Sequence, residues 1–525
     1  MSNVNASSLN IAKALESMAH DVGDRNAFVL IGGKRSKPRY VTFAELHEQV
    51  AHCAGGMLRM GITRGERVVV FVPMSLELYV ILLALFRIGA VAVFIDPWLG
   101  RATIDAATGL VEPTAFFGIP KAQALRAMSP ALREISPSVI VSGGRVPVGR
   151  LVPGATDFRQ VMRVAPGKRV HTAVDVTEDD PALITFTTGS TGMPKGANRT
   201  HGFLAAQNHV LSQHVNLGLD DIVLTNLPIV VLHNLGRGAT TILPPRAAAQ
   251  DAQPDGTWLH AMAKSNRATV LAMSPSPLDA LTHSRDRSPL KLVHSAYSGG
   301  GPVLPDLLDR AQVMLPNATI MVFYGSTESE PIAHCTADEV RKRRQGVREH
   351  GGIYVGAPVP EVDVRLLRPT AGPIELVAGS TLDDWEVEPG AAGEVIVAGP
   401  HVNRDYYRNE AAFAENKIID EHGRTWHRTG DMARAASDGG LWLLGRLTGA
   451  FKVKGQTVYP FEVETPLCEL PEVARAAACT PKFEGSSREF KNAAAVIAVE
   501  PAPGYSRDQA RIASLAYLHA IGYDD

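Results

Sequence analysis

The chain reads Thr187-Thr188-Gly189-Ser190-Thr191-Gly192-Met193-Pro194-Lys195-Gly196 immediately after the strand-like run Ala182–Phe186. Glycines allow backbone N–H groups to turn toward a ligand, hydroxyl side chains add donors, and one Lys supplies a positive charge. Placed between a strand and a predicted helix, this composition indicates a phosphate-binding loop rather than a flexible surface loop. It is not a Walker A motif, because no Gly directly precedes Lys195 and no Ser or Thr directly follows it.

Length and composition limit the classes of protein. A chain of 525 residues is too long for one compact core, so we expect two or more domains. A formal net charge of −2 gives no support for a nucleic-acid or membrane-surface partner. The four cysteines form no CxxC pair, which argues against a zinc site or a disulfide framework and favours the cytoplasm. The N-terminus predicts no signal peptide.

Alternating elements predict an α/β fold. The apolar runs Val68–Val72 and Val91–Ile95 read as buried strands, and Phe43–Met60 and Leu76–Ile88 read as helices. Such alternation predicts a parallel sheet covered on both faces. Glu77 and Arg87 argue against a transmembrane segment in this region.

The predicted organisation is a large N-terminal domain, residues 1–446, and a small C-terminal domain, residues 447–525. The large domain would hold parallel-type sheets covered by helices, and a small β-barrel-like subdomain at about residues 352–444, where short strands alternate with turns. The small domain would be a mobile α+β module ending in the helix Arg507–Ala520. Val146–Asp180 shows no clear periodicity and is expected to be a surface connection.

Two further glycine-containing turns follow predicted strands. Gly299-Gly300-Gly301 comes after the strand predicted at Leu292–Ser295, and Gly325-Ser326-Thr327-Glu328 comes after the strand predicted at Thr319–Tyr324. In α/β folds, ligands bind at the carboxyl ends of parallel strands. We therefore expect the three glycine-containing turns to meet at one crevice.

With these motifs the chain resembles the adenylate-forming enzymes, which include acyl-CoA synthetases, peptide-synthetase adenylation domains and luciferases. Four ordered motifs carry the resemblance: Thr187–Gly196, Tyr324-Gly325-Ser326-Thr327-Glu328, Thr429-Gly430-Asp431, and the hinge region with Gly445-Arg446 and Lys452-Val453-Lys454-Gly455. The resemblance implies attack by a carboxylate on the α-phosphate of ATP, giving acyl-AMP and pyrophosphate.

The resemblance also implies roles for single residues. Lys195, Thr327, Glu328 and His233 would be catalytic, and Glu328 would hold Mg²⁺. ATP or AMP would contact the following residues: Thr187, Thr188, Gly189, Ser190, Thr191, Gly192, Gly299, Gly300, Gly301, Tyr324, Gly325, Ser326, Asp431 and Arg446.

Each assignment has a structural alternative. Glu328 alone would be a solvated surface charge, Thr327 could cap a helix, and Asp431 could form a turn. Gly299–Gly301 could be a plain tight turn, and Arg446 a simple surface residue. His233 lies in Leu227–Gly236, which resembles the family's acyl-pocket segment lengthened by two residues, but it could be a structural histidine.

Finer features point to one branch of the family. Val93–Pro97, Phe117–Ala122 and Gly423–Asp431 are similar to the olefin-pathway β-lactone synthetases, in which the substrate's own hydroxyl closes on the activated carbonyl. The expected substrate is a medium- or long-chain or β-hydroxy fatty acid. The alternatives are a ligase that passes the acyl group to coenzyme A, a carrier protein or an amine, and a non-catalytic nucleotide- or acyl-binding protein. Coenzyme A is not indicated by any motif, and pathway enzymes are further candidate partners.

Two features depart from the family pattern. The hinge position that usually holds Asp or Lys is Thr448, followed by Gly449. The family's C-terminal lysine has no match before Asp525, so the last module is expected to be truncated in this sequence.

Overall fold

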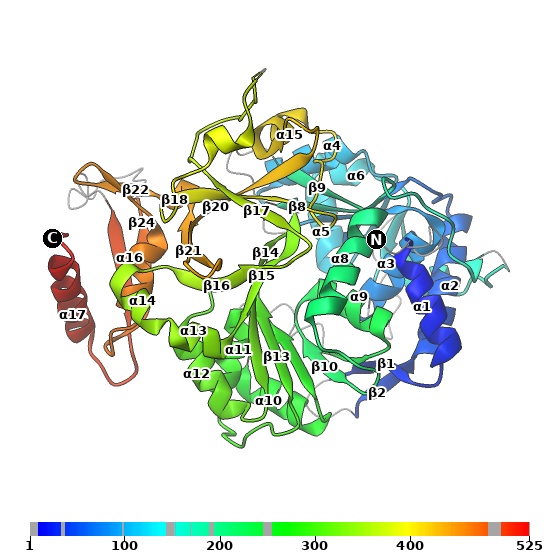
Figure 1. Cartoon of the computed structure of the whole chain (residues 1–525). Coiled ribbons are helices and arrows are strands. Elements are labelled where there is room, and N and C mark those ends of the chain that lie inside the picture. Colours follow the sequence, from blue (N-terminus) through cyan, green and yellow to red (C-terminus); the bar gives the residue numbers. More distant parts are fainter. Residues whose placement is uncertain are drawn as a thin grey trace.

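The structure, a computed structural model, describes residues 9–32, 37–96, 99–142, 152, 154–167, 170–187, 194–244, 255–377, 379–480 and 495–523. The described strands form two large sheets and two small two-stranded sheets. Figure 1 shows helices between and around the large sheets, with the C-terminal segment in orange and red at one side of the molecule.

The smaller of the two large sheets carries the start of the predicted phosphate loop. Its described strands lie in the order β7-β6-β5-β3-β4-β8-β9, and all neighbours are parallel except the antiparallel pair β8 and β9. The strands are β3 (Arg67–Phe71), β4 (Val91–Ile95), β5 (Ala115–Gly118), β6 (Ser138–Ile140), β7 (Ala155–Asp157), β8 (Pro181–Thr187) and β9 (Lys195–Thr200). The predicted loop therefore joins β8 to β9, and Lys195 begins β9.

The larger sheet changes from parallel to antiparallel at β14. Its described strands follow the order β17-β18-β20-β21-β16-β15-β14-β13-β12-β10-β11-β1-β2, with β19 paired to β20. Neighbours from β14 to β1 are parallel, and the remaining neighbours are antiparallel. The strands are β1 (Asn26–Leu30), β2 (Arg39–Thr42), β10 (Ile222–Thr225), β11 (Thr240–Leu243), β12 (Val270–Met273), β13 (Ser295–Gly299), β14 (Thr319–Ser326), β15 (Ser329–Thr336), β16 (Ile353–Pro358), β17 (Asp363–Leu367), β18 (Ala392–Ala398), β19 (Lys417–Ile419), β20 (Thr425–Ala435) and β21 (Leu441–Arg446).

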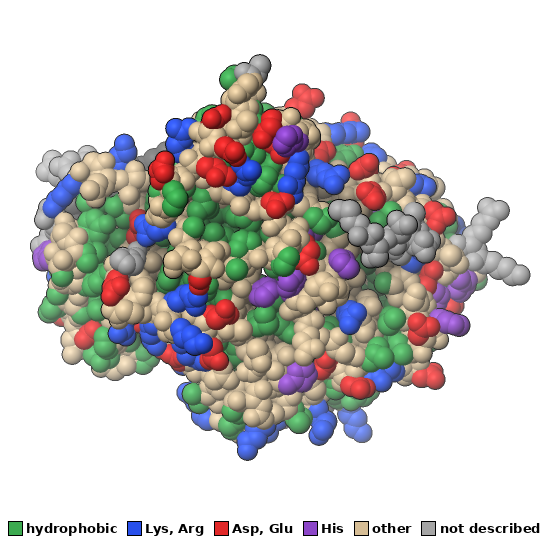
Figure 2. Space-filling view, viewed as in Figure 1, with side chains coloured by type: hydrophobic (Ala, Val, Ile, Leu, Met, Phe, Trp, Pro, Cys, Tyr) green, Lys and Arg blue, Asp and Glu red, His purple; other side chains and the backbone are tan. Residues whose placement is uncertain are grey.

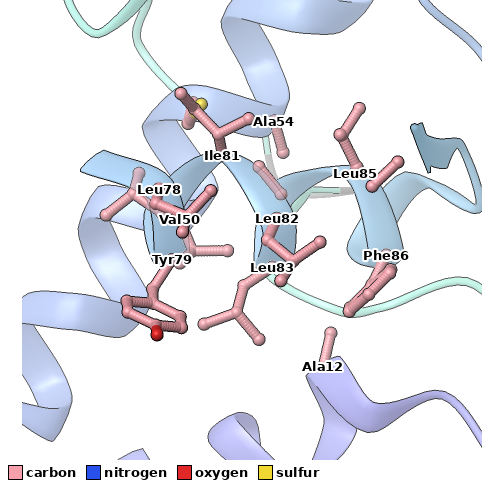
Figure 3. Packing of buried hydrophobic residues seen from close by; sticks show 14 of the residues in the cluster. Ala12, Val50, Ala54, Leu78, Tyr79, Ile81, Leu82, Leu83, Leu85 and Phe86 are labelled. Atoms are coloured by element: carbon pink, nitrogen blue, oxygen red, sulfur yellow. The ribbon is translucent and has the colours of Figure 1, made fainter. Parts of the chain in front are cut away.

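A shared core joins the two sheets. It contains residues of β3 and β8 from one sheet, of β1 and β11 from the other, of the short helix at residues 158–161, and of five longer helices. These helices are α1 (Ile11–Asp21), α2 (Phe43–Arg59), α3 (Leu76–Ile88), α8 (His201–His214) and α9 (Pro228–Arg237). Figure 3 shows Leu82, Leu85 and Phe86 of α3 beside Ala54 of α2 and Ala12 of α1.

Helix α3 shows how the sequence produces this core. The Ser75 side chain caps its first turn, and Gly89 ends it in the left-handed conformation with φ 72°. The charged side chain of Arg87 is fully buried but bonds to the Nδ1 of His47 at 3.0 Å. The apolar run is therefore a buried core helix, and no helix in the described residues is long and apolar enough to cross a membrane.

The outer faces of both sheets carry further helices. On the smaller sheet these are α4 (Arg101–Val111), α5 (Pro120–Met128) and α6 (Pro130–Glu134). On the larger sheet these are α10 (Gly256–Ser265), α11 (Pro275–Thr282), α12 (Pro305–Met314) and α13 (Ala337–Lys342). The shorter helices α7 (Phe158–Val161), α14 (Arg344–His350) and α15 (Glu410–Asn416) and the 3₁₀ turns Leu382–Trp385 and Leu447–Gly449 complete this part.

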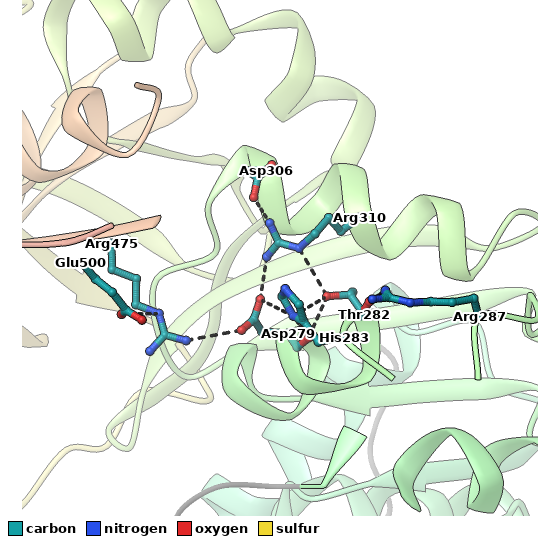
Figure 4. Close-up of polar contacts among 8 residues, drawn as sticks. All are labelled: Asp279, Thr282, His283, Arg287, Asp306, Arg310, Arg475 and Glu500. Atoms are coloured by element: carbon teal, nitrogen blue, oxygen red, sulfur yellow. Dashed lines mark hydrogen bonds and ion pairs between the residues drawn. The ribbon is translucent and has the colours of Figure 1, made fainter. Parts of the chain in front are cut away.

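The C-terminal segment packs on α14 and β21 and forms an ion pair with α11. It comprises β22 (Phe451–Val453), β23 (Gln456–Val458), α16 (Pro460–Leu467), β24 (Val473–Cys479), β25 (Val496–Pro501) and α17 (Arg507–Ala520). In Figure 4, Arg475 of β24 reaches Asp279 of α11, with 3.4 Å between nitrogen and oxygen, and Arg310 of α12 binds the other oxygen of Asp279.

Most of the predicted elements are present. Helices 76–88 and 507–520 and the strand 91–95 have the predicted bounds. The expectation that Val146–Asp180 is a surface connection is wrong for residues 155–161, where β7 pairs with β6, Asp157 caps α7, and Phe158 and Val161 are buried. The strand predicted at Leu292–Ser295 begins three residues later, so the first glycine of the cluster ends β13. The helix α9 was not predicted from its apolar sequence.

Surface charge agrees with the small net charge. Figure 2 shows Lys and Arg side chains interspersed with Asp and Glu over the visible face, without a large field of one sign. Proteins that bind nucleic acid through its phosphates present a basic patch, and this face does not.

One buried ion pair allows a test of the antiparallel part of the large sheet. Arg428 of β20 binds Glu394 of β18 at 2.6 Å, and both side chains are at most 6% exposed. Glu394→Ala removes the carboxylate that neutralises the buried guanidinium and should lower the free energy of unfolding by about 3–5 kcal/mol. Asp383→Ala, which breaks an exposed pair with Arg365, should cost less than about 1 kcal/mol. Denaturation monitored by circular dichroism checks both, and equal shifts would contradict the assignment.

Candidate active site

The two described glycine turns lie side by side at the ends of neighbouring strands. Gly299 at the end of β13 pairs with Phe323 of β14, directly before Tyr324. A Cβ on Gly299 would lie 2.6 Å from the Phe323 carbonyl oxygen, and Gly300 has a φ of +79°. The backbone therefore needs glycine at both positions whatever binds there, so the tight-turn alternative remains open for this cluster. Gly301 has no such close contact.

Tyr324, Asp431 and Arg446 form one connected group. The buried Tyr324 hydroxyl donates to Asp431 Oδ2 at 2.9 Å, and Arg446 Nε lies 3.0 Å from Asp431 Oδ1. Burial raises the pKa of the Asp431 carboxyl, while Arg446 and the Tyr324 hydroxyl oppose that rise. Each carboxylate oxygen retains capacity for a second hydrogen bond, so the group can bind paired hydroxyls.

The turn between β14 and β15 places Thr327 and Glu328. The Thr327 carbonyl accepts two hydrogen bonds from the buried Arg199 of β9, at 3.1 and 2.7 Å, and the Ser326 hydroxyl accepts from the Glu328 N–H at 3.3 Å. A strand rather than a helix follows at Ser329, which rules out the helix-cap alternative for Thr327.

Glu328 has specific partners and is not a solvated surface charge. The Tyr406 hydroxyl donates to Glu328 Oε1 at 3.0 Å, and the Asn403 N–H donates to the Glu328 carbonyl at 2.6 Å. Burial raises the pKa of Glu328, but His427, Lys417 and the Tyr406 hydroxyl together lower it below its ordinary value. The carboxylate is therefore charged at neutral pH.

Lys417 places a buried amine beside this carboxylate. It is 3% exposed and its ammonium lies 5.2 Å from the centre of the Tyr406 ring. Burial lowers the pKa of Lys417 to about 7, although Glu328 and Asp405 raise it.

Lys195 binds the end of α15, which lies between Tyr406 and Lys417 in the chain. Its ammonium, on a side chain 9% exposed, binds Glu415 Oε2 at 2.9 Å and Asn416 Oδ1 at 3.3 Å. Residues 403–409 also run along β9: the Tyr407 N–H donates to the Gly196 carbonyl at 2.8 Å, and Asn409 Nδ2 donates to the Pro194 carbonyl at 3.3 Å. Residues 403–417, the bracket segment, therefore contact both Lys195 and Glu328.

The rest of the predicted phosphate loop cannot be placed. Thr188, Gly189, Ser190, Thr191 and Gly192 lie outside the described residues, as does the side chain of Thr187. The expectation that three glycine-containing turns meet at one crevice is therefore tested only for the turns at residues 299–301 and 325–328, which are neighbours.

His233 is buried in α9, separate from the charged groups. Its Nδ1 lies 2.8 Å from Asn208 Oδ1, and its Nε2 has no hydrogen-bond partner among the described residues. Burial lowers the pKa of His233 to about 4, so the ring is neutral. One helical turn earlier, Val230 packs in an apolar cluster with Tyr297 and Phe323, the residues that precede the two glycine turns.

The structure thus brings together most of the predicted residues that it describes. Strand β20 contacts each of these groups. It carries Asp431 and pairs with β21 at Arg446. Its His427 lies near Glu328, and its Arg428 binds the Glu415 carbonyl. Sequence reasoning missed four contributors: Arg199, Tyr406, Glu415 and Lys417. Two consecutive tyrosines, Tyr406 and Tyr407, were the signal in the sequence that could have pointed to the bracket segment. The sequence around Lys417 gave no sign that this lysine is buried at the site.

The donor set suits Mg²⁺ held jointly with a phosphate ligand. No described group of three or more His, Cys, Asp or Glu side chains could hold a metal ion by itself. Mg²⁺ commonly binds through one or two carboxylates together with substrate phosphates, and the ionised Glu328 offers one such carboxylate.

Comparison with known proteins agrees with this geometry. The model of the AMP-binding enzyme family matches residues 15–407. An olefin beta-lactone synthetase of Xanthomonas campestris is 30% identical over 484 residues, covering 89% of this chain and 84% of the relative. A peroxisomal OPC-8:0-CoA ligase of Arabidopsis thaliana is 27% identical, covering 90% and 81% of the two chains.

A solved structure supports the fold independently. The amide bond synthetase McbA from Marinactinospora thermotolerans superposes with a TM-score of 0.75 at 23% identity, covering 98% of this chain and 93% of that one. Because the family model spans well over half of the sequence, the chain belongs to the AMP-binding enzymes, the adenylate-forming family.

Proposed function

We propose that this adenylate-forming enzyme uses ATP and Mg²⁺ to activate a β-hydroxy fatty acid and then closes the acyl group to a β-lactone. The arrangement of Lys195, Glu328 and the Tyr324–Asp431–Arg446 group around β20 supports the activation step. The likeness to an olefin beta-lactone synthetase over 89% of this chain supports the second step. A cytoplasmic location belongs to the same proposal.

In this proposal the charged residues hold the nucleotide. Asp431 accepts hydrogen bonds from the ribose hydroxyls while Tyr324 and Arg446 hold its two oxygens in place. Lys195 binds the phosphates, and Glu328 holds Mg²⁺ with its carboxylate fixed by Tyr406. Mg²⁺, when bound, neutralises phosphate charge. The Thr327 hydroxyl donates to the phosphate under attack, and Arg199 fixes the backbone of that residue.

The acid substrate would lie beside the two glycine turns at residues 299–301 and 325–328, next to apolar side chains. Val230, Tyr297 and Phe323 pack in one uncharged cluster beside Gly299 and Tyr324, and such an apolar environment suits an alkyl chain. His233 lies one turn from Val230 on α9 and keeps a buried ring nitrogen without a described partner. That nitrogen would accept a hydrogen bond from the substrate hydroxyl.

The chemistry balances without another substrate. A carboxylate oxygen attacks the α-phosphorus, the bond to the bridging oxygen breaks, and pyrophosphate leaves. The β-hydroxyl oxygen then attacks the carbonyl carbon, AMP leaves with the electron pair of the broken bond, and the hydroxyl proton is released to water. Lys195 and the bracket segment supply positioning and charge neutralisation, which dominate such reactions.

A second candidate is transfer of the acyl group to coenzyme A. A CoA ligase is also a relative, at 27% identity over 90% of this chain. Transfer to a carrier protein or an amine would use the same first step.

Mass spectrometry of the product separates these candidates. Incubation with a β-hydroxy acid, ATP and Mg²⁺ should give a product lighter than the acid by one water, together with AMP and pyrophosphate. A product that forms only with coenzyme A would overturn lactone formation but not adenylation.

Lys195→Ala tests the phosphate role. Loss of this cation should lower the rate of ATP–pyrophosphate exchange by about 10²-fold, because a preorganised charge at the phosphates is removed. Binding of the acid, measured by calorimetry, should change much less. Equal exchange rates in the variant and the parent would refute the role.

Tyr406→Phe tests the metal role of Glu328. Loss of a hydrogen bond to a charged group costs about 1.5 kcal/mol, so half-maximal exchange should need about tenfold more Mg²⁺. Tyr407→Phe is the matched control, since the described contact of Tyr407 with β9 is made by its backbone. An unchanged Mg²⁺ requirement in Tyr406→Phe would contradict the assignment.

A further inference from the structure

The ammonium of Lys195 has two protein partners of different charge. Glu415 Oε2 lies 2.9 Å from Nζ and carries a negative charge, whereas Asn416 Oδ1 lies 3.3 Å away and is neutral. Asn416 Nδ2 donates to the Ala412 carbonyl at 2.8 Å, which turns its oxygen toward Lys195. Orientation of the lysine therefore does not depend on the carboxylate alone.

Glu415 is held against the lysine by its own backbone. The Asn409 side chain caps α15 by accepting from the Ala412 N–H at 2.9 Å, and Asn409 also bonds to the Pro194 carbonyl. At the other end of α15, Arg428 Nη1 donates to the Glu415 carbonyl at 3.2 Å. The carboxylate is thus fixed beside β9 at both ends of the helix.

Because Glu415 is held against Lys195, its carboxylate and a bound phosphate would compete for the same ammonium. A phosphate that binds Lys195 approaches an ammonium already paired with an anion, and two anions near one cation repel each other. The pair is only partly open to solvent, with 9% of the Lys195 and 31% of the Glu415 side chain exposed, so water screens the repulsion incompletely.

We propose that Glu415 is an affinity-setting residue that competes with the terminal phosphates of ATP for Lys195. The inference rests on the proposed role of Lys195 in phosphate binding. Glu415 weakens binding of ATP and eases release of pyrophosphate, while Asn416 orients the lysine without adding charge.

Glu415→Gln is the test, because glutamine keeps an oxygen that can accept from Lys195 but removes the charge. We expect Kd for Mg·ATP and for pyrophosphate, measured by calorimetry, to fall by about three- to tenfold. Kd for AMP, which lacks the terminal phosphates, should change less than twofold. The tightening should shrink at high salt.

Two further variants make the result decisive. Glu410→Gln makes the same charge change in the first turn of the same helix, at an exposed side chain, and should leave Kd for Mg·ATP unchanged. Asn416→Ala removes the neutral acceptor and should slow pyrophosphate exchange without tightening ATP.

The outcomes separate this inference from the proposed function. If the parent protein binds no Mg·ATP, both the proposed function and the role of Glu415 are refuted. If the parent binds Mg·ATP but Glu415→Gln binds it equally or more weakly, the competition is refuted and Glu415 is a positioning residue for Lys195.

Discussion

The candidate site depends on one constraint: a charge taken out of water needs a partner. Lys195, Glu328, Asp431 and Arg428 are each buried or largely buried, and each is paired within the chain. Their partners come from β18, β21, α15 and the bracket segment, which all adjoin β20. The antiparallel half of the large sheet therefore holds its own buried charges in place and, through Glu415, also holds Lys195 of the smaller sheet.

Much of the fold follows from local sequence. Ser75 and Gly89 delimit a continuous apolar run, so both ends of α3 could be predicted. The motif residues Tyr324 and Asp431 are far apart in sequence, yet the resemblance indicated that both contact the nucleotide, and their side chains meet at 2.9 Å. Positions fixed by a cap or by a motif were predictable for this reason.

The remaining contacts depend on tertiary structure. Lys417 shares a strand face with Ile419, which is 45% exposed, so alternation alone would place the lysine in solvent. Its burial follows from the neighbouring Glu328, Asp405 and Tyr406, which come from other parts of the chain. Helix α9 was likewise not predicted: Val230, Val231 and Leu232 are consecutive apolar residues, and such a short run does not by itself distinguish a helix from a strand. Lys417 has no local signal, and the local signals of α9 are Pro228 at its start and Gly238 after its last residue.

The separation between the apolar cluster and the charged network has an evolutionary consequence. Val230, Tyr297 and Phe323 come from three different elements and carry no charge. Substitutions among them alter volume and shape without removing the partner of a buried ion, and such apolar exchanges are tolerated well. A duplicated gene could therefore drift toward acids of another size one residue at a time, with its chemical machinery inherited intact.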